Sequence, residues 1–338
     1  MSAVTTFSLP DPAQPLDQAT AADAFALILS GRIEDDAIAA FLIGLAERGE
    51  TAAELAAGAA AMRDVMLRVS APEGAIDVCG TGGDMANTLN ISTAVGFVVA
   101  AAGVPVARHG NRAASSQSGV ADILSSLGWQ GDLPIDRIEA SFAEVGIAFL
   151  HAQRHHPAMA KVAGVRRRIG RRTIFNLLGP LANPAAVRRQ MIGVFARHWL
   201  VPMAEAARTL GSDDVLLAHG SGLDEVAVHD SSNIVRLAGG GISESLFDPA
   251  ALGLGPHPLE SLRGGPPEQN AEVLRALFAG KRDTATLRAY HDIVVANSAA
   301  ALLVAGAAPD MATGARIAAD QLASGAAEDR LARFIAFR

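Results

Sequence analysis

The chain has 338 residues, of which 50% are hydrophobic, and this is enough to bury a large core and to form two domains. Its formal net charge of −7 and isoelectric point of about 5.7 give no overall basic field that would attract nucleic acid or an anionic membrane. The single cysteine excludes an internal disulfide, and the N-terminus has no signal-peptide pattern, so we expect a cytoplasmic protein. No apolar stretch is long enough to span a bilayer.

Residues 1–72 predict a small domain made only of helices. The first 15 or so residues form a loose lead-in, and apolar residues then repeat with helical spacing up to about residue 70. Three helix N-termini are predicted: one at Thr20 with Asp23, one at Asp35 or Asp36, and one at Thr51 with Glu54. Gly31 is predicted to end the first of these helices. Later helices, at about 155–185, are expected to pack with this domain.

From residue 73 to residue 338 the pattern changes to alternating strands and helices. The strand candidates are residues 75–79, 104–107, 147–150, 190–194, 215–218 and 226–228. Loops are expected at 239–241 and 253–267, and helices at about 268–280, 284–306 and 310–324. This alternation predicts an α/β fold whose central sheet is mostly parallel and is flanked by helices.

The first strand candidate leads into a loop with three glycines in four positions, Gly80, Gly82 and Gly83. We call residues 80–90 the glycine loop. A helix-like run at 94–102 follows, and hydroxyl and amide side chains crowd the same stretch: Thr81, Thr88, Asn90, Ser92 and Thr93. Glycines allow close backbone approach, and helix starts offer unpaired N–H groups to anions. A phosphate or pyrophosphate site is favoured over a simple turn, although no P-loop lysine follows and Met85 breaks the dinucleotide pattern.

Two further loops carry polar groups after strand candidates. Residues 108–119 offer two guanidinium groups, an imidazole, two amides and three hydroxyls. These donors favour a binding site for a polyanion over an ordinary polar surface loop. Residues 220–225 end in Asp224 and Glu225, a pair that could bind Mg²⁺ together with waters and phosphate oxygens. Acidic pairs on loops are usually only solvated, so the metal role depends on their position beside two candidate anion loops.

The segment 155–172 is locally basic, and two interpretations remain open. It could be a nucleic-acid patch, or a helix that turns one arginine inward to an anionic substrate; the acidic chain and the absence of interleaved aromatics favour the second. His155 and His156 have no metal-ligand spacing with a cysteine, so we interpret them as structural, with His156 lining the site. Cys79 ends a mostly apolar strand and is interpreted as a buried filler rather than a nucleophile.

Taken together, these motifs resemble the anthranilate phosphoribosyltransferase family, whose members have the nucleoside phosphorylase/phosphoribosyltransferase fold. The resemblance runs in order from about residue 20 to the end of the chain. The matching motifs are Gly-Thr-Gly-Gly-Asp at 80–84, Asn-Ile-Ser-Thr at 90–93, His-Gly-Asn-Arg at 109–112, His-Pro-Ala-Met at 156–159, the stretch 172–184, Gly-Leu-Asp-Glu at 222–225, Gly-Gly at 264–265 with Asn-Ala at 270–271, and Asn-Ser-Ala-Ala at 297–300.

The resemblance implies a pentosyltransferase of tryptophan biosynthesis that moves 5-phosphoribosyl from phosphoribosyl pyrophosphate (PRPP) to the amine of anthranilate. It also implies a cytoplasmic homodimer with two Mg²⁺ ions. The implied PRPP contacts are Gly80, Gly83, Asp84, Thr88, Asn90, Ile91, Ser92, Thr93, Arg108, His109, Gly110, Asn111, Arg112, Ala113, Ala114, Ser115, Ser116 and Val120. The implied anthranilate contacts are Gly80, Asn111 and Arg166, and the implied metal ligands are Ser92, Asp224 and Glu225. No covalent nucleophile is required, and His109 is the candidate for a general base.

The chain departs from the family pattern at a few positions. Arg108 stands where the family often has lysine, His151 and Gln153 replace an aromatic residue and a proline, and Val120 replaces a small or hydroxyl residue. Two alternatives are a pyrimidine nucleoside phosphorylase and a non-catalytic nucleic-acid-binding relative of the same fold. The acidic pair and the glycine loop argue against the first, and the acidic net charge argues against the second.

Overall fold

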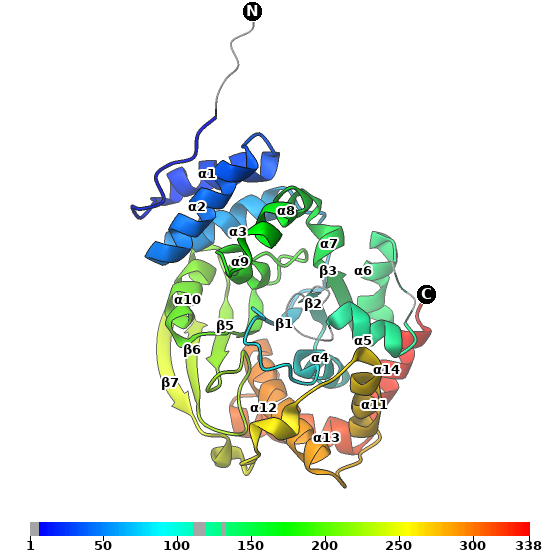
Figure 1. The fold of residues 1–338 in the computed structure, drawn as a ribbon. Helices are drawn as coiled ribbons and strands as arrows, with labels where there is room; N and C mark the ends of the chain where they lie inside the picture. The colour runs from blue at the N-terminus through cyan, green and yellow to red at the C-terminus, as the bar shows by residue number, and fades with distance from the viewer. Residues whose placement is uncertain (1–6, 111–118, 130, 132) are drawn as a thin grey trace, which may run out of the picture.

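The computed structural model describes residues 7–110, 119–129, 131 and 133–338, and Figure 1 shows a helical bundle at one end of an α/β body. The bundle contains α1 (Gln18–Ser30), α2 (Asp35–Arg48) and α3 (Ala52–Asp64), against which α8 (Ala160–Ile169) and α9 (Phe175–Leu181) pack. Phe25 lies at its centre and makes edge-on contacts with the rings of Phe41 and Phe175, each 6.2 Å away. These residues join helices from distant parts of the chain into one core.

Some of the predicted helix ends are confirmed and others are wrong. Thr51 and Glu54 form the expected capping box, and Gly31 ends α1 with a left-handed φ of 74°. The expected cap at Thr20 is wrong, because Asp17 accepts a hydrogen bond from the Thr20 N–H at 2.8 Å and α1 begins at Gln18. The expected cap at Asp35 or Asp36 is also wrong, since Glu34 precedes the helix. Both aspartates lie in its first turn, where the helix dipole favours negative charge.

A seven-stranded sheet in the order β3-β2-β1-β4-β5-β6-β7 forms the centre of the larger body. The first five strands are parallel, as predicted: β1 (Ile76–Gly80), β2 (Val106–Gly110), β3 (Ile147–His151), β4 (Arg189–Gly193) and β5 (Asp214–His219). The expected strand at 226–228 is wrong. Both backbone groups of Val226 bond to the side chain of Asn297, so they do not join a neighbouring strand.

An antiparallel hairpin that the sequence did not predict completes the sheet. It consists of β6 (Ser232–Ala238) and β7 (Gly241–Phe247), and the expected loop at 239–241 is its turn. Gly239 and Gly240 have φ values of 56° and 79°, which suit the tight turns that join antiparallel strands. Most residues of β7 are exposed, so the strand lacks the buried apolar run that marks the other strands.

Helices cover both faces of the sheet. On one face lie α4 (Ile91–Ala101), α11 (Pro267–Phe278), α12 (Ala285–Ala305), α13 (Met311–Ala323) and α14 (Ala326–Ala336). On the other lies α10 (Leu200–Thr209), together with α3 and α9. The three predicted C-terminal helices are confirmed, whereas α14 was not expected; its Phe334 ring stacks on Trp129 at 5.2 Å. The described chain also contains α5 (Val120–Ser126), α6 (Ile135–Glu144) and α7 (Ala152–His155).

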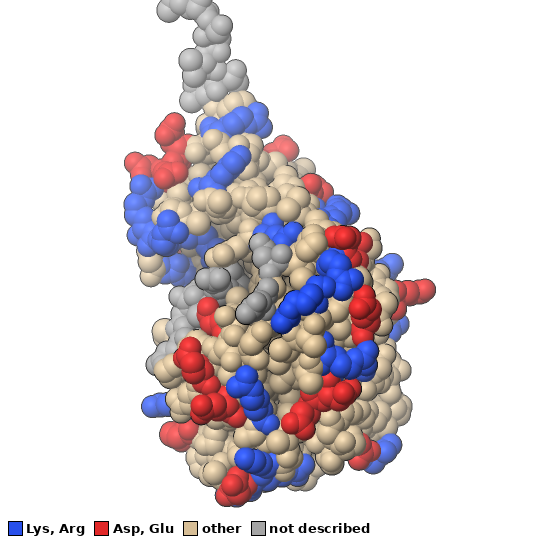
Figure 2. Space-filling model, turned by 90° about the vertical axis from the view of Figure 1, so that its right-hand side faces the viewer, with Lys and Arg blue, Asp and Glu red and all other residues tan. Residues whose placement is uncertain are grey.

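The order of the strands determines where a ligand can bind. From β1 the chain proceeds outward through β2 and β3, and it then returns to β4 on the opposite side of β1. The carboxyl ends of β1 and β4 therefore flank a switch point, which is where open α/β sheets bind ligands. None of the described helices has both the length and the apolarity that crossing a bilayer would require. The face drawn in Figure 2 carries acidic and basic side chains mixed together.

Candidate active site

Two glycines at the switch point allow the acidic loop, residues 220–226, to lie directly on the sheet. Gly80 ends β1 and pairs in register with Gly193 at the end of β4. A Cβ atom on Gly80 would lie 2.4 Å from the Asp224 Oδ2 atom, and one on Gly193 would lie 1.5 Å from the Asp224 backbone oxygen. The Gly82 N–H donates to Asp224 Oδ2 at 2.7 Å. The glycine loop and the acidic loop, which were predicted separately, are therefore in direct contact.

Three carboxylates gather where these loops meet. Burial, followed by the negative charge of Asp84, raises the pKa of Asp224 well above its ordinary value. Burial and the charges of Asp224 and Asp84 likewise raise the pKa of Glu225, while Arg108 acts in the opposite direction. Hard oxygen ligands that repel one another fit a divalent cation such as Mg²⁺. In the described parts of the chain, no three acidic, histidine or cysteine side chains form a ready-made metal cluster, so substrate and water oxygens would have to complete the shell.

A buried amide fixes the end of the acidic loop. The Asn297 Oδ1 atom accepts from the Val226 N–H at 2.8 Å, and Nδ2 donates to the Val226 carbonyl at 2.9 Å and to the Ile293 carbonyl at 2.8 Å. Asn297 is completely buried within α12. The sequence placed this residue in a matching motif but assigned it no role, although a polar amide in the mostly apolar second half of the helix was the available signal.

The start of α4 forms another side of the site. The helix begins at Ile91, so Ser92 and Thr93 lie in its first turn rather than before it, which corrects the expected start at 94. Asn90 precedes this turn and is held by Tyr290 Oη, which donates to its carbonyl at 3.2 Å, and by Asn270 Nδ2, which donates to its Oδ1 atom at 3.0 Å. The first-turn N–H groups are thus fixed near the acidic loop, and such groups favour an anion. Thr88 pairs with Arg263 in an isolated bridge.

The sequence suggested that Arg108 and His109 lie in the loop after the strand. In the structure they belong to β2 itself. Because successive strand side chains point to opposite faces, the two residues face different surroundings. The buried Arg108 side chain donates from Nη2 to Ser92 Oγ at 2.6 Å and from Nε to the Ser92 carbonyl at 3.3 Å. It therefore stabilises the start of α4, and its charge acts on Glu225.

His109 is buried on the other face of the sheet and is held neutral. Its Nδ1 atom lies 3.0 Å from the Gly179 carbonyl, which can only accept, so the proton is on Nδ1 and Nε2 is an acceptor that has no partner among the described residues. Burial, followed by the nearby His156, lowers the pKa of His109 to about 3. Burial and His155 lower the pKa of His156 to about 4. The two rings lie 5.1 Å apart, and neither imidazole is charged at neutral pH.

A buried carboxylate supports the end of β2. Asp77, the one polar residue of the first strand candidate, accepts the His109 backbone N–H at 3.1 Å. Its other oxygen accepts from Asn183 Nδ2 at 2.8 Å, and the same Nδ2 group donates to the Ala107 carbonyl at 2.8 Å. Burial raises the pKa of Asp77 to about 6. The sequence analysis gave Asp77 and Asn183 no positioning role, because both act through the backbone.

A cavity of about 530 Å³ opens between the helical bundle and the sheet edge. We call it the helix–sheet cavity. Its lining includes Met62, Cys79, Gly80, His109, Gln153, His156, Met159, Ala163, Arg166, Phe175, Gly179 and Pro180. His156 and Arg166 both line this cavity. Arg166 lies 5.7 Å from the centroid of the Phe175 ring, and its guanidinium is the cationic group of this mostly apolar lining. Such a cavity fits a small, flat, anionic molecule.

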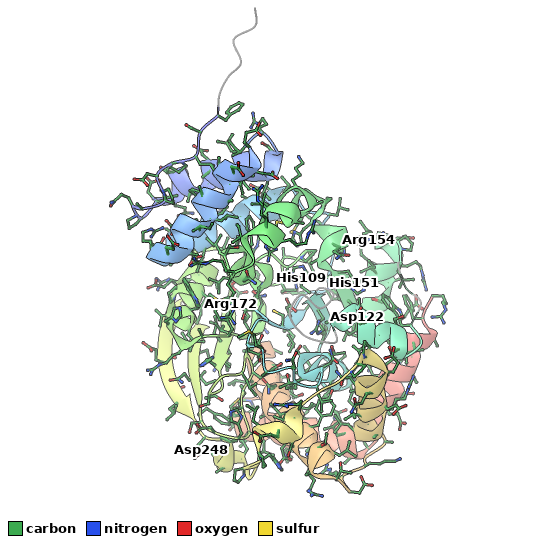
Figure 3. The ribbon with its side chains drawn as sticks, viewed as in Figure 1. His109, Asp122, His151, Arg154, Arg172 and Asp248 are labelled. Carbon is green, nitrogen blue, oxygen red and sulfur yellow. The ribbon has the colours of Figure 1, made fainter. Side chains whose placement is uncertain are left out.

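The other predicted residues fall in different places. Burial raises the pKa of Cys79 well above its ordinary value, so its thiol stays protonated, as expected for a filler. Gln153 lines the cavity, whereas the His151 ring lies 5.7 Å from that of Trp129. Gly110 ends β2, and Val120 begins α5 as a buried residue. The predicted site residues that lie outside the described part of the chain are Asn111, Arg112, Ala113, Ala114, Ser115 and Ser116. His109 and Arg172 are labelled in Figure 3 between the bundle and the sheet.

Comparison with known proteins gives a consistent result over nearly the whole chain. Residues 11–66 match the helical bundle domain of the glycosyl transferase family, and residues 72–328 match its a/b domain. An anthranilate phosphoribosyltransferase of Rhodospirillum rubrum is 52% identical over 324 residues, which cover 96% of this chain and 92% of the relative.

Solved structures show the same likeness. The anthranilate phosphoribosyltransferase from Thermus thermophilus matches with a TM-score of 0.90 at 38% identity, covering 97% of this chain and 99% of that one. The enzyme from Saccharomyces cerevisiae, in complex with PRPP and Mg, matches with a TM-score of 0.85 at 26% identity, covering 95% and 93% of the two chains.

Proposed function

Since this chain belongs to the anthranilate phosphoribosyltransferase family of glycosyl transferases, we propose that the contact between its glycine and acidic loops, beside the helix–sheet cavity, is where its reaction takes place. The reaction transfers the 5-phosphoribosyl group of PRPP to the amine of anthranilate and releases pyrophosphate and N-(5-phosphoribosyl)anthranilate, a step of tryptophan biosynthesis. The observation that supports this placement most directly is the hydrogen bond from Gly82 to Asp224, which brings the two loops together at the switch point.

We propose that the donor, PRPP, lies over the glycine loop and the first turn of α4. Its contacts would be Gly80, Gly83, Asp84, Thr88, 90–93, 108–116 and Val120. Ser92, Asp224 and Glu225 would hold two Mg²⁺ ions, and the mutual repulsion of the buried carboxylates supports this assignment. When bound, Mg²⁺ would neutralise charge on the leaving pyrophosphate. The yeast relative was solved with PRPP and Mg, which also supports the proposal.

Anthranilate would occupy the helix–sheet cavity. Arg166 would bind its carboxylate, and apolar side chains from α3 and α8 would contact its ring. Gly80 and Asn111 would complete the contacts that the family resemblance implies. His109 lines this cavity, and its buried Nε2 atom, which has no partner among the described residues, would accept a hydrogen bond from the amine. Because the amine is a weak nucleophile, alignment with the anomeric carbon is the main requirement.

The chemistry requires charge stabilisation and one proton acceptor. As the bond to pyrophosphate lengthens, the anomeric carbon gains oxocarbenium character, and the fixed N–H groups of the α4 start favour the departing negative charge. When the carbon–nitrogen bond has formed, the nitrogen carries an acidic proton. A neutral His109 would accept that proton only in passing. Burial lowers the pKa of its imidazole to about 3, which leaves Nε2 unprotonated at neutral pH but makes it a weak base that must pass the proton on to water.

We further propose residues 1–72 and 73–338 as the two domains, a homodimer as the assembly, and the cytoplasm as the location. The matches of the helical bundle domain to 11–66 and of the a/b domain to 72–328 support the boundary. The single cysteine supports a reducing compartment.

The proposed function is tested by mixing the protein with PRPP, Mg²⁺ and anthranilate and following anthranilate fluorescence. We expect the fluorescence to fall only when all components are present. Leaving out PRPP, or adding a chelator for Mg²⁺, provides the controls. Unchanged fluorescence at micromolar enzyme would contradict the proposal.

Replacing Arg166 by alanine should raise the KM for anthranilate by about 10- to 100-fold, since a hydrogen-bonded charge pair contributes about 1.5–3 kcal/mol. The KM for PRPP should change little, because Arg166 lies in the wall of the helix–sheet cavity. Steady-state kinetics with each substrate varied in turn would measure both constants. Arg167→Ala is the matched control, because its side chain is exposed on the same helix. An equal rise in both KM values would contradict the acceptor role.

A further inference from the structure

Arg172 lies in the short linker between α8 and α9 and contacts the glycine loop. Its Nη2 group donates to the Gly83 carbonyl, and its guanidinium carbon lies 4.3 Å from the centroid of the Phe195 ring. The side chain is otherwise exposed to solvent. Neither the donor site nor the acceptor site proposed above gives this residue a role, so its contact with the loop needs an explanation.

The glycine loop is held from two sides at adjacent residues. Gly82 donates to Asp224 on the acidic loop, and Gly83 accepts from Arg172 on the linker. Gly83 has a φ of 83°, and a Cβ atom on it would lie 3.2 Å from Arg172 Nε. The backbone of the loop therefore lies close against the arginine, in a conformation that glycine adopts without strain.

Phe195 connects the same two parts. Its backbone N–H donates to Thr81 Oγ1 at 3.0 Å, so the residue under the guanidinium also contacts the glycine loop. A planar guanidinium stacks flat on an aromatic face while it donates from its edge, whereas an ammonium group can lie over a ring but cannot stack on it. The arrangement uses both properties of arginine.

The linker that carries Arg172 joins two helices that line the helix–sheet cavity. Gly170 ends α8, which carries Arg166, and the Thr173 N–H bonds to the side chain of Asn176, which lies on α9 and lines the cavity. We propose that Arg172 is a positioning residue that ties the glycine loop to the wall of the acceptor cavity, so that donor and acceptor are presented to each other in register. This inference rests on the proposed function, which assigns PRPP to the glycine loop.

The test uses the full-length enzyme with Arg172→Ala, Arg172→Lys and the control Arg171→Ala. Arg171 is the neighbouring arginine and reaches Glu47 through an exposed ion pair of 3.3 Å. Without substrates, hydrogen–deuterium exchange of peptides covering residues 81–88 should be faster in Arg172→Ala than in the wild type and unchanged in Arg171→Ala. The KM for PRPP should rise about tenfold in Arg172→Ala, the value expected for one lost charge-assisted hydrogen bond. The lysine variant should recover only part of this loss.

Three outcomes would overturn the proposal: unchanged exchange in Arg172→Ala, faster exchange with an unchanged KM for PRPP, or full recovery by lysine. Full recovery would mean that the charge alone acts on the pyrophosphate. If Arg172→Ala fails to fold, Phe195→Leu removes the ring beneath the guanidinium and should change the exchange in the same direction. The exchange measurement needs no substrate, and the proposed function is judged separately by wild-type turnover, so the two failures are distinguishable.

Discussion

Replacing Asp224 by asparagine together with Glu225 by glutamine is expected to lower kcat by at least about 10³-fold and to stabilise the metal-free protein. The activity falls because the amides cannot hold the cations that offset the charge of the leaving pyrophosphate. The fold is retained because asparagine can still accept the Gly82 N–H and glutamine can still accept the Ser92 N–H. Kinetics with saturating Mg²⁺ and thermal melting in chelator would measure the two effects.

The pH dependence of the gain in stability follows from the direction of the pKa shifts. The pKa values of both carboxyls are raised in the folded state from the ordinary values of 3.8 and 4.5. Their contribution to stability is therefore complete below those values and is lost as the pH rises. The double variant should gain nothing near pH 4 and roughly 1–3 kcal/mol near pH 8. Glu244→Gln, at an exposed site on β7, should change neither property. Wild-type turnover in the double variant would rule out the metal role.

Replacing Gly193 by alanine is expected to destabilise the fold and remove most of the activity. The new Cβ atom would lie 1.5 Å from the backbone oxygen of Asp224, and a backbone atom cannot rotate away as a side chain can. Either β4 or the acidic loop must move, at a cost of about 3 kcal/mol or more. We expect a melting temperature lower by about 5 °C and a kcat lower by about 100-fold.

Gly164→Ala is the matched control for this substitution. Gly164 lies within α8, and a Cβ atom there would meet nothing within 4 Å. Alanine at a helical position should stabilise the protein by roughly 0.5–1 kcal/mol and leave kcat unchanged. Calorimetry on the two variants therefore gives shifts of opposite sign. A Gly193→Ala protein with wild-type melting and turnover would show that the acidic loop does not need the glycine surface.

The sequence was informative where local pattern and three-dimensional structure agree. The parallel strands are buried apolar runs. The glycine loop combines closely spaced glycines with hydroxyl and amide side chains, a composition typical of anion-binding loops. Asp224 and Glu225 could be associated with the glycine loop because the loop and the acidic pair each follow a strand of the same parallel sheet. The strand at 226–228 was predicted wrongly because its apolar residues are buried by α12, and Asn297 takes the backbone bonds that a strand would have made.

Other features could not be derived from local pattern. β2 ends three residues beyond the apolar run at 104–107 from which it was predicted, so Arg108 and His109 are strand residues. As neighbours in a strand, their side chains point to opposite faces of the sheet. The neutral state of His109 depends on burial by α9, which lies about 70 residues away in the sequence. Arg172 lies in a basic run whose local pattern gives it no role, and its contacts with Gly83 and Phe195 set it apart from Arg171. These properties arise from contacts between distant segments.

The helix–sheet cavity takes its wall from two regions of the chain that have different tasks. The surface that would bind the pyrophosphate is made of backbone and fixed by steric fit, so Gly80 and Gly193 leave little freedom for change. The opposite wall is made of ordinary side chains on α3, on α8 and on the turn before α8, including Met62, Met159 and Ala163. Evolution or an engineer can therefore alter the aromatic amine that is accepted without altering the chemistry of the donor. We therefore expect the choice of acceptor to tolerate substitutions better than the activation of the donor does.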